Sequence, residues 1–141
     1  MTCMREMRPR DHHCHISHRC VPQYDHHCNW INNCVGRHNL ARFNLFILTL
    51  TAALLWLAYL ATHIALSTLN HTQDTLLFSL RDWTTDTLQP LVFALTALVL
   101  LLALLFAVPL LCLIMVQMKN LLLGKTTYER FSKSQESILT R

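Results

Sequence analysis

Two long stretches of the sequence contain no charged side chain, and they constrain the fold more than any other feature. They run from Phe43 to Leu69 and from Leu91 to Met118, and they are 27 and 28 residues long. A helix of about 20 apolar residues crosses the hydrocarbon core of a bilayer. Each stretch is therefore predicted to be a transmembrane helix. The alternative is a pair of buried helices in a soluble protein, and such helices would dominate so small a domain.

The composition favours the membrane interpretation. Charged residues make up 14% of the 141-residue chain and hydrophobic residues 52%, whereas soluble domains carry about 25% charged residues. The same figures exclude an intrinsically disordered chain, which needs low hydrophobicity and high charge. Neither stretch lies at the N-terminus, so neither is predicted to be a signal peptide.

The basic residues predict how the chain is oriented in a membrane. Residues 1–42 carry six arginines and residues 119–141 carry five basic side chains, whereas residues 70–90 carry Arg81 alone against three aspartates. Lys and Arg are enriched in the cytosolic flanks of membrane spans. Both termini are therefore expected in the cytosol, and residues 70–90 are expected to form a lumenal or external loop.

Residues 1–42 contain five of the six cysteines and seven of the nine histidines. They show no helical period and are predicted to form loops and short turns, which need a source of stability other than an apolar core. Cytosolic thiols are not expected to form disulfides, and thiolate and imidazole are the ligands that tetrahedral zinc prefers. This segment is therefore predicted to be stabilised by zinc.

The cysteines of this segment have a distinctive spacing. Ten residues lie between Cys3 and Cys14, five between Cys14 and Cys20, and five between Cys28 and Cys34. Asp25-His26-His27-Cys28 lies within this pattern, and Asn32-Asn33-Cys34-Val35-Gly36 follows it. The pattern resembles the DHHC cysteine-rich domain of membrane protein S-acyltransferases, the palmitoyltransferases. Thr126-Thr127-Tyr128-Glu129, after the second apolar stretch, resembles the TTxE element of the same family.

The resemblance implies a membrane protein with all-α transmembrane helices and a small, zinc-stabilised, loop-rich cytosolic domain. The expected divisions are a DHHC cysteine-rich domain over residues 1–42, membrane helices over 43–69 and 91–118, a loop over 70–90, and a cytosolic tail with the TTxE motif over 119–141. Two further membrane helices precede this domain in the family, so the chain is expected to be a fragment or a divergent member.

Two structural zinc sites are implied by the resemblance, each lacking one of the three cysteines that the family uses with one histidine. The first would use Cys3, His13 and Cys20, and the second Cys14, His27 and Cys34. Ser17 stands where the family has the missing cysteine of the second site. A neutral hydroxyl is a poor zinc ligand, so His15, His18 or water remains open as the fourth ligand.

Cys28 occupies the position of the family's acyl-carrying nucleophile. A nucleophilic cysteine must be a thiolate, which requires a nearby base or positive charge. His26, two residues away, can take the thiol proton, and Asp25 can orient the imidazole. In the family the second Thr of TTxE hydrogen-bonds this aspartate, which pairs Thr127 with Asp25. The alternative role for Cys28 is a further zinc ligand.

The implied function is protein S-palmitoylation. Cys28 would take a palmitoyl or other long-chain acyl group from acyl-CoA and pass it to a cysteine of a membrane-associated substrate protein. The candidate cations for the CoA phosphates are Arg37, Arg42, Lys119, Lys125 and Arg130, whose alternative role is the cytosolic charge bias alone. The expected location is the Golgi or the endoplasmic reticulum.

Two other functions remain to be weighed. Ser17 and the missing helices favour a catalytically impaired, DHHC-like membrane scaffold. The basic charge also allows a zinc protein that binds nucleic acid, but the chain lacks a basic recognition helix and the spacing of DNA-binding fingers. No nucleic-acid partner is therefore expected.

Overall fold

The computed structural model describes residues 7–75 and 83–132. The chain divides into two compact units, each of which is treated by itself. The first combines Met1–Leu48 with Cys112–Arg141, and the second comprises Thr49–Leu111. We call them the cysteine-rich unit and the helical unit. The predicted ligand Cys3 and residues 133–141 lie outside the described residues.

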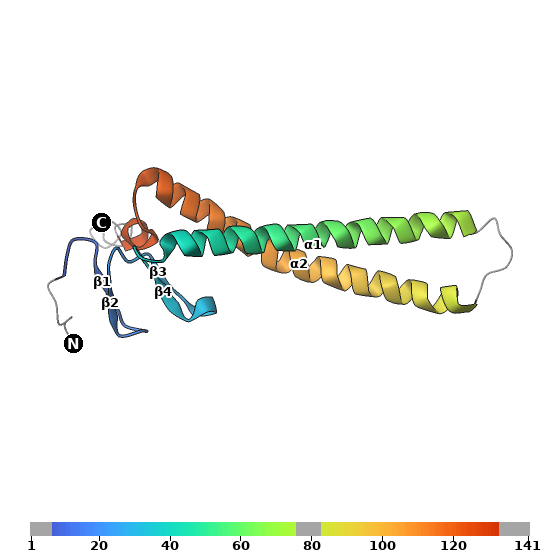
Figure 1. The fold of residues 1–141 in the computed structure, drawn as a ribbon, viewed down its shortest axis with the longest axis horizontal. Coiled ribbons are helices and arrows are strands. Elements are labelled where there is room, and N and C mark those ends of the chain that lie inside the picture. Colours follow the sequence, from blue (N-terminus) through green and yellow to red (C-terminus); the bar gives the residue numbers. More distant parts are fainter. Residues whose placement is uncertain (1–6, 76–82, 133–141) are drawn as a thin grey trace, which may run out of the picture. The chain divides into compact units, whose positions relative to one another are not determined.

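The cysteine-rich unit contains two short β-hairpins (Figure 1). Strand β1 (His12–Cys14) pairs antiparallel with β2 (Arg19–Val21), and β3 (His26–Cys28) pairs antiparallel with β4 (Asn33–Val35). The expectation of loops and short turns therefore missed these strands. Each strand has only three residues, which is too short for an alternating pattern to stand out in the sequence.

Residues with positive φ help to close both hairpins. His18 lies just before β2 with φ 50°. A 3₁₀ helix, η1 (Asn29–Ile31), follows β3 and ends at Asn32, which has φ 46° and ψ 43°. This left-handed conformation is unfavourable for most residues but accessible to asparagine, whose short polar side chain bonds locally. The turn therefore returns the chain from Cys28 to Cys34 within six positions.

Gly36 allows the two hairpins to lie close together. A Cβ atom at this position would come within 2.7 Å of the Val21 Cγ1 atom and 2.8 Å of the Pro22 carbonyl oxygen. The Arg37 N–H donates to that same carbonyl at 3.0 Å. The requirement for glycine here is steric, because real Cβ atoms do not approach backbone so closely.

Helix α1 (Leu40–Thr75) begins directly after the second hairpin. The Asn39 side chain joins the two elements: its Oδ1 accepts from the Gly36 N–H, and its Nδ2 donates to the Cys34 carbonyl, both at 2.9 Å. Phe43 and Ile47, on the first turns of α1, are buried. The hairpin is thereby fixed to the start of the helix.

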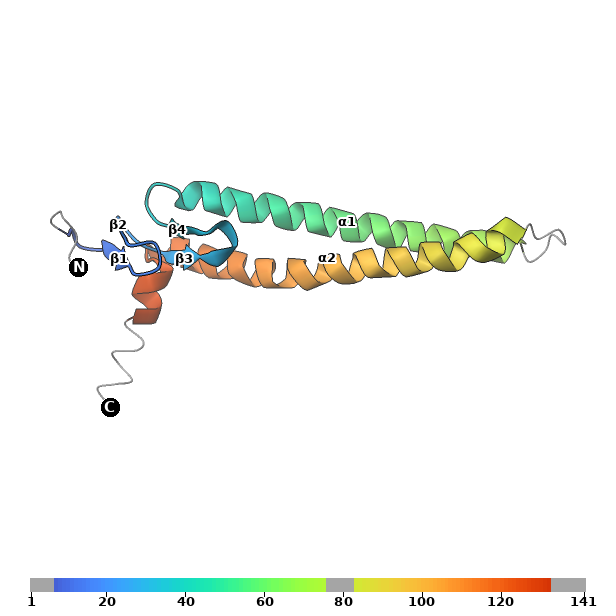
Figure 2. The same ribbon diagram turned by 90° about the horizontal axis from the view of Figure 1, so that it is seen from below.

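Helix α2 (Trp83–Leu123) ends in the cysteine-rich unit, and the chain then turns at Gly124 into a short helix over residues 127–132. Gly124 has φ 60°, which is the left-handed conformation that commonly ends helices. Figures 1 and 2 both show this short helix turning away from the end of α2. The Tyr128 N–H donates to the Asp25 carbonyl at 3.1 Å, which holds the short helix beside β3.

The two apolar stretches fall within α1 and α2, and the candidate membrane spans are Leu40–Leu69 and Leu88–Leu123. Only 22% and 11% of their most apolar windows is buried within the chain, unlike helices in the core of a soluble protein. Among the residues of the helical unit whose burial is described, the buried apolar side chains are small, namely Ala58, Ala61, Ala103 and Ala107. Small residues at buried positions are typical of membrane helices.

The helices extend beyond the predicted spans. Residues 70–75 belong to α1, residues 83–90 belong to α2, and residues 119–123 still belong to α2 rather than to a tail. Polar residues at the ends of a membrane helix do not stop the helix, because the backbone pattern continues past the apolar core of a bilayer. Hydropathy therefore predicted where the apolar part lies but not where each helix ends.

Candidate active site and metal centre

Strand β3 carries His26, His27 and Cys28 in succession. Side chains alternate between the two faces of a strand, so His26 and Cys28 share one face and His27 points to the other. Residues two apart on a strand are separated by about 6.6 Å. Cys28 is buried, with 9% of its surface exposed, and is a free thiol. The strand thus separates a histidine–cysteine pair on one face from a possible metal ligand on the other.

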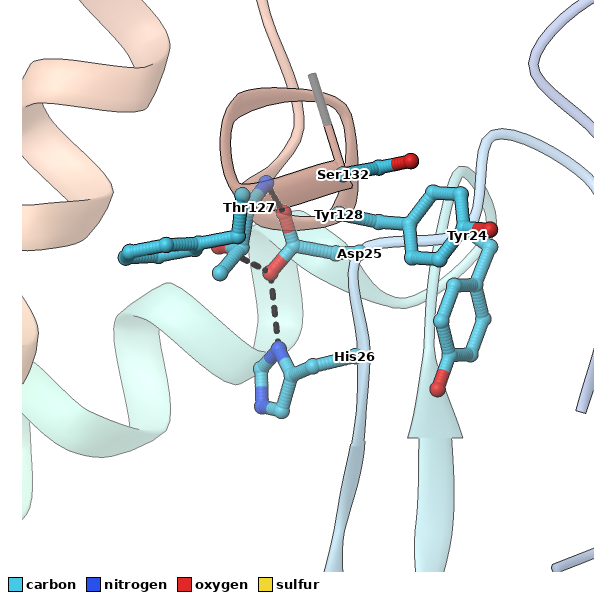
Figure 3. A pocket seen from close by; sticks show the side chains of 7 residues that line it. Tyr24, Asp25, His26, Thr127, Tyr128 and Ser132 are labelled. Atoms are coloured by element: carbon cyan, nitrogen blue, oxygen red, sulfur yellow. Dashed lines mark hydrogen bonds and ion pairs between the residues drawn. The ribbon is translucent and has the colours of Figure 1, made fainter. Parts of the chain in front are cut away.

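Asp25 precedes β3 and is one of the most buried residues of the described chain, with 2% of its surface exposed. Its carboxylate accepts four hydrogen bonds (Figure 3), of which three are drawn there. The donors are His26 Nδ1 at 2.7 Å, the Thr127 N–H at 2.7 Å, Thr127 Oγ1 at 2.9 Å and Gln117 Nε2 at 3.1 Å. The predicted pairing of Thr127 with Asp25 is therefore present in the structure.

These hydrogen bonds determine the charge of Asp25. Burial favours the neutral carboxyl, but hydrogen bonds from His26, Thr127 and Gln117 outweigh it and hold the pKa of Asp25 below its usual value. An ionised Asp25 can only accept hydrogen bonds. His26 Nδ1 must then carry the proton of this hydrogen bond, and in a neutral imidazole with that proton Nε2 is the acceptor.

The imidazole of His26 is also held by packing. The Phe43 ring lies edge-on to it, with ring centroids 5.1 Å apart. A cavity of about 450 Å³ opens beside Asp25 and His26, and its walls include Tyr24, Thr127 and Tyr128. Figure 3 shows the side chains that line this cavity.

The segment Thr126-Thr127-Tyr128-Glu129 starts the short helix with a reciprocal cap. The Thr126 N–H donates to Glu129 Oε2 at 2.9 Å, and the Glu129 N–H donates to Thr126 Oγ1 at 3.2 Å. This capping box satisfies backbone donors that a helix start leaves unpaired. Arg10 Nη2 also donates to Glu129 Oε2, at 3.0 Å, and to the Gly124 carbonyl at 3.1 Å. The TTxE pattern is thus a helix start that places Thr127 against Asp25.

The other face of β3 contributes to a group of possible metal ligands formed by Cys14, His27 and Cys34, whose donor atoms lie within 4.8 Å of one another. His27 Nδ1 is 3.7 Å from Cys14 Sγ and 3.4 Å from Cys34 Sγ. Zinc bond lengths of about 2.3 Å to sulfur and 2.0 Å to nitrogen place tetrahedral S and N ligands about 3.5 Å apart. The three donors therefore fit a zinc ion.

Ser17 lies beside two members of this group, Cys14 and Cys34. Its Oγ is 3.0 Å from Cys34 Sγ. Burial opposes ionisation of Cys14, but hydrogen bonds from the side chain and backbone of Ser17 outweigh it and lower the pKa of Cys14 to about 6. Among the described residues neither His15 nor His18 joins the group, and the His15 ring instead packs against His13 at 5.3 Å.

The predicted first zinc site is described only in part. His13 and Cys20 are partners across the β1–β2 hairpin, and His13 Nδ1 lies 3.4 Å from Cys20 Sγ. The third predicted ligand, Cys3, lies outside the described residues. Cys20 is disulfide-bonded in the structure, contrary to the expectation that the thiols of this segment form no disulfides. A disulfide and a zinc site are alternative uses of the same sulfur atom.

Two of the predicted CoA-binding cations line a second cavity, of about 230 Å³. Arg37 and Lys125 lie on its wall together with Arg10, and we call it the basic pocket. Arg42 is exposed on α1 and does not line it. Arg130 instead donates from Nη1 to Asn120 Oδ1 at 2.6 Å. Lys119 is exposed on α2.

Gln117 and Asn120 take part in the site but were not predicted from the sequence. Both are buried near the end of α2, and Asn120 Nδ2 donates to Thr127 Oγ1 at 2.7 Å. Their spacing of three residues, which places two amides on one face of a helix, is the signal that could have found them. Arg10 was likewise counted only as a charge.

Comparison with protein families gives one match, to the DHHC palmitoyltransferase family, over residues 1–134. Comparison with curated proteins gives no match. The match extends from the N-terminus through both hairpins, both apolar helices and the short helix that caps the site. The chain belongs to the DHHC palmitoyltransferase family.

Proposed function

We propose that the chain is a protein S-acyltransferase that moves a palmitoyl or other long-chain acyl group from acyl-CoA to cysteines of membrane-associated proteins. The observation that carries the proposal is the buried Asp25–His26 pair at 2.7 Å, on the strand that carries Cys28. The orientation of His26 by Asp25 leaves Nε2 free to take a proton. His26 and Cys28 share a strand face, so the base and the nucleophile lie on the same side.

The reaction has two thioester exchanges. The Cys28 thiol gives its proton to His26 Nε2, and the thiolate attacks the acyl carbonyl carbon. The bond to the CoA sulfur breaks, and the CoA thiolate takes the proton from His26. The substrate thiol then repeats these steps on acyl-Cys28, and Cys28 leaves with the proton. Each exchange breaks one thioester and forms another, so the rate depends on thiolate supply and on positioning.

Acyl-CoA would be held at two places. Its phosphates are anionic, and the cations of the basic pocket, Arg37 and Lys125, are our candidate ligands. Arg42 and Arg130 remain secondary candidates, because Arg42 does not line this pocket and Arg130 already donates to Asn120. The acyl chain would lie among the exposed apolar side chains of α1 and α2 and the surrounding lipid.

Zinc is proposed as a structural ion. Cys14, His27 and Cys34 would hold it at the second site. A first site formed by His13, Cys20 and Cys3 would require the Cys20 sulfur to be reduced. When bound, zinc supplies cross-links that replace an apolar core. Zinc bound to His27 would fix one face of β3, while His26 and Cys28 act on the other face.

The membrane topology is part of the proposal. Both apolar helices would cross the bilayer with both termini in the cytosol, where CoA and substrate thiols are present. The bias of basic residues toward residues 1–42 and 119–141 supports this orientation. The Golgi or the endoplasmic reticulum remains the expected location.

The test is a covalent acyl label. Incubation of the membrane-embedded protein with labelled palmitoyl-CoA should give a hydroxylamine-sensitive label, which the Cys28→Ser variant should lack. Cys112 is a free thiol exposed on α2, so Cys112→Ser is the matched control and should retain the label. An unlabelled wild-type protein would favour the scaffold function, and a label that survives in Cys28→Ser would contradict the assigned nucleophile.

A further inference from the structure

Two buried amide side chains lie near the end of α2, after a stretch from Leu91 to Val116 that is apolar apart from Thr96. Gln117 and Asn120 have only 5% and 4% of their surface exposed. Burying an amide is unfavourable unless its polar atoms find hydrogen-bond partners. Both residues belong to the cysteine-rich unit, and their partners there are residues of the candidate active site.

The amides form part of a directional chain of hydrogen bonds. Arg130 Nη1 donates to Asn120 Oδ1 at 2.6 Å, and Asn120 Nδ2 donates to Thr127 Oγ1 at 2.7 Å. Thr127 Oγ1 in turn donates to Asp25 Oδ2 at 2.9 Å. A hydroxyl that accepts from one group is a better donor to the next. This series of hydrogen bonds therefore links Arg130, through Asn120 and Thr127, to the Asp25 carboxylate.

Gln117 donates a hydrogen bond directly to the same oxygen of the Asp25 carboxylate. Its Nε2 lies 3.1 Å from Asp25 Oδ2, the atom that also accepts from His26 Nδ1 at 2.7 Å and from Thr127 Oγ1. Hydrogen bonds from these three side chains hold the Asp25 carboxylate in one orientation. The direction of the His26 imidazole is then determined by an oxygen atom that cannot swing away.

We propose that Gln117 and Asn120 are positioning residues for the acyl transfer. Gln117 holds Asp25 directly, and Asn120 holds it through Thr127, so that His26 Nε2 faces Cys28. The proposal rests on the proposed function and extends it to α2. The end of this helix is therefore a wall of the acid–base site as well as a part of a membrane span.

The test is the rate of acyl-Cys28 formation by the full chain in a bilayer. Gln117→Met keeps an unbranched side chain and removes the donor, and it should lower the maximal rate about tenfold or more. The palmitoyl-CoA concentration that gives half the maximal rate should not change, because Gln117 positions the base. Gln117→His has an N–H at similar reach and should restore most of the rate.

Two further variants separate positioning from folding. Gln117→Asn keeps the buried amide but shortens it by one methylene, so it should slow the reaction. The thermal unfolding temperatures of Gln117→Asn and Gln117→Met show that both variants remain folded at the temperature of the assay. Met118, exposed on the same helix, gives the matched control: Met118→Leu should leave the rate unchanged. A wild-type rate in both Gln117→Met and Gln117→Asn would overturn the proposal for Gln117.

Combined variants test the route through Asp25. In an Asp25→Asn background, Gln117→Met should cause no further loss of rate, because residues that act through one group are not additive. Likewise, adding Asn120→Leu to a Thr127→Val variant should cause no further loss of rate. Additive losses in both pairs would contradict a positioning role and indicate independent structural damage.

A second readout does not need acyl-CoA. The rate at which iodoacetamide alkylates Cys28, followed on the Cys28 peptide, depends on thiolate supply. Gln117→Met should slow this alkylation relative to Met118→Leu. A wild-type chain without acyl label would defeat the proposed function alone, whereas equal alkylation rates in the two variants would defeat the positioning role.

Discussion

Asp25 connects the separate parts of the site. Its side chain binds His26, Gln117 and Thr127, and its backbone bonds to Val35 on one side and Tyr128 on the other. A buried carboxylate persists only when its oxygen atoms are satisfied. One residue therefore joins β3, α2 and the short helix, and substitutions in any of the three are expected to reach the base at His26.

Ser17 gives a prediction about the metal centre. Cys14, His27 and Cys34 supply three donors, and the Ser17 hydroxyl lies 3.0 Å from one of them, Cys34 Sγ. Thiolate is a much better zinc ligand than a neutral hydroxyl. Ser17→Cys should therefore raise the affinity of this site at least about tenfold, measured by competition with a chelator.

Cobalt substitution provides the spectroscopic side of the same test. Replacing Ser17 by Cys should strengthen the thiolate-to-cobalt absorption that Cys14 and Cys34 already give the Co²⁺-loaded protein. Ser67 is exposed on α1, and Ser67→Cys adds a thiol away from the site, so it should leave affinity and spectrum unchanged. If Ser17→Cys also leaves the affinity and the spectrum unchanged, Ser17 does not face the metal.

The residue pattern pointed to the proposed reacting groups more directly than to the residues that support them. Cys28, His26 and Asp25 lie within four positions of one another, so a short motif could place them together. Gln117 lies 92 positions from Asp25, and nothing near it in the sequence points to the hairpin. A polar residue near the end of an apolar stretch also has an ordinary explanation at the membrane surface, which is why its role emerged only from the fold.

The short helix over residues 127–132 is the element that closes the site. Its first turn is fixed by the Thr126–Glu129 capping box and by Arg10. An isolated helix of this length is not stable in water. Its order therefore depends on these contacts and on the hydrogen bonds of Thr127 and Tyr128 with Asp25.

Glu129 tests this dependence. Glu129→Ala removes the cap and the Arg10 contact, and it should lower the free energy of unfolding by about 1 kcal/mol. It should also slow acyl-Cys28 formation, because Thr127 would no longer be held against Asp25. Chemical denaturation in detergent and the acylation assay measure the two effects.

Glu129→Gln distinguishes the cap from the ion pair. Glutamine can still accept from the Thr126 N–H, while the ionic part of the contact with Arg10 is lost. Because exposed ion pairs contribute little to stability, this variant should behave almost like the wild type. Damage equal to that of Glu129→Ala would assign the effect to the charge.

The β-hairpins show where element prediction from sequence reached its limit. His13 and Cys20 pair across one hairpin, and His27 and Cys34 pair across the other. Three-residue strands have no detectable period, and their pairing is stabilised by contacts between hairpins, such as Arg37 with the Pro22 carbonyl. The metal-ligand spacing was visible in the sequence, but the strands that produce it were not.

The described residues combine a polar segment rich in cysteine and histidine with two long apolar helices. Large apolar side chains such as Trp56, Leu101 and Phe106 are exposed on these helices, and a surface of this kind on a protein marks an interaction with a membrane or another protein. A membrane-embedded chain is expected to resist alkaline carbonate extraction. The positions of the basic residues then determine which end faces which compartment.

Epitope tags test the predicted topology. Tags at both termini should be accessible to antibody after selective permeabilisation of the plasma membrane, whereas a tag inserted between Ser79 and Leu80 should become accessible only when all membranes are permeabilised. The tagged chains should first be shown to bind zinc as the untagged chain does. An accessible internal tag, or a protected terminus, would contradict the expected orientation.

Asp25 and Thr127 are separated by 102 positions, which has a consequence for the order in which the protein becomes active. A ribosome completes the DHHC segment and both apolar helices before it makes Thr127. Until then Asp25 lacks the two hydrogen bonds that Thr127 donates. The hydrogen bonds of Asp25 can be completed only after both apolar helices and Thr127 have been synthesised, so a nascent chain would lack a fully assembled Asp25–His26 site while those helices are being made.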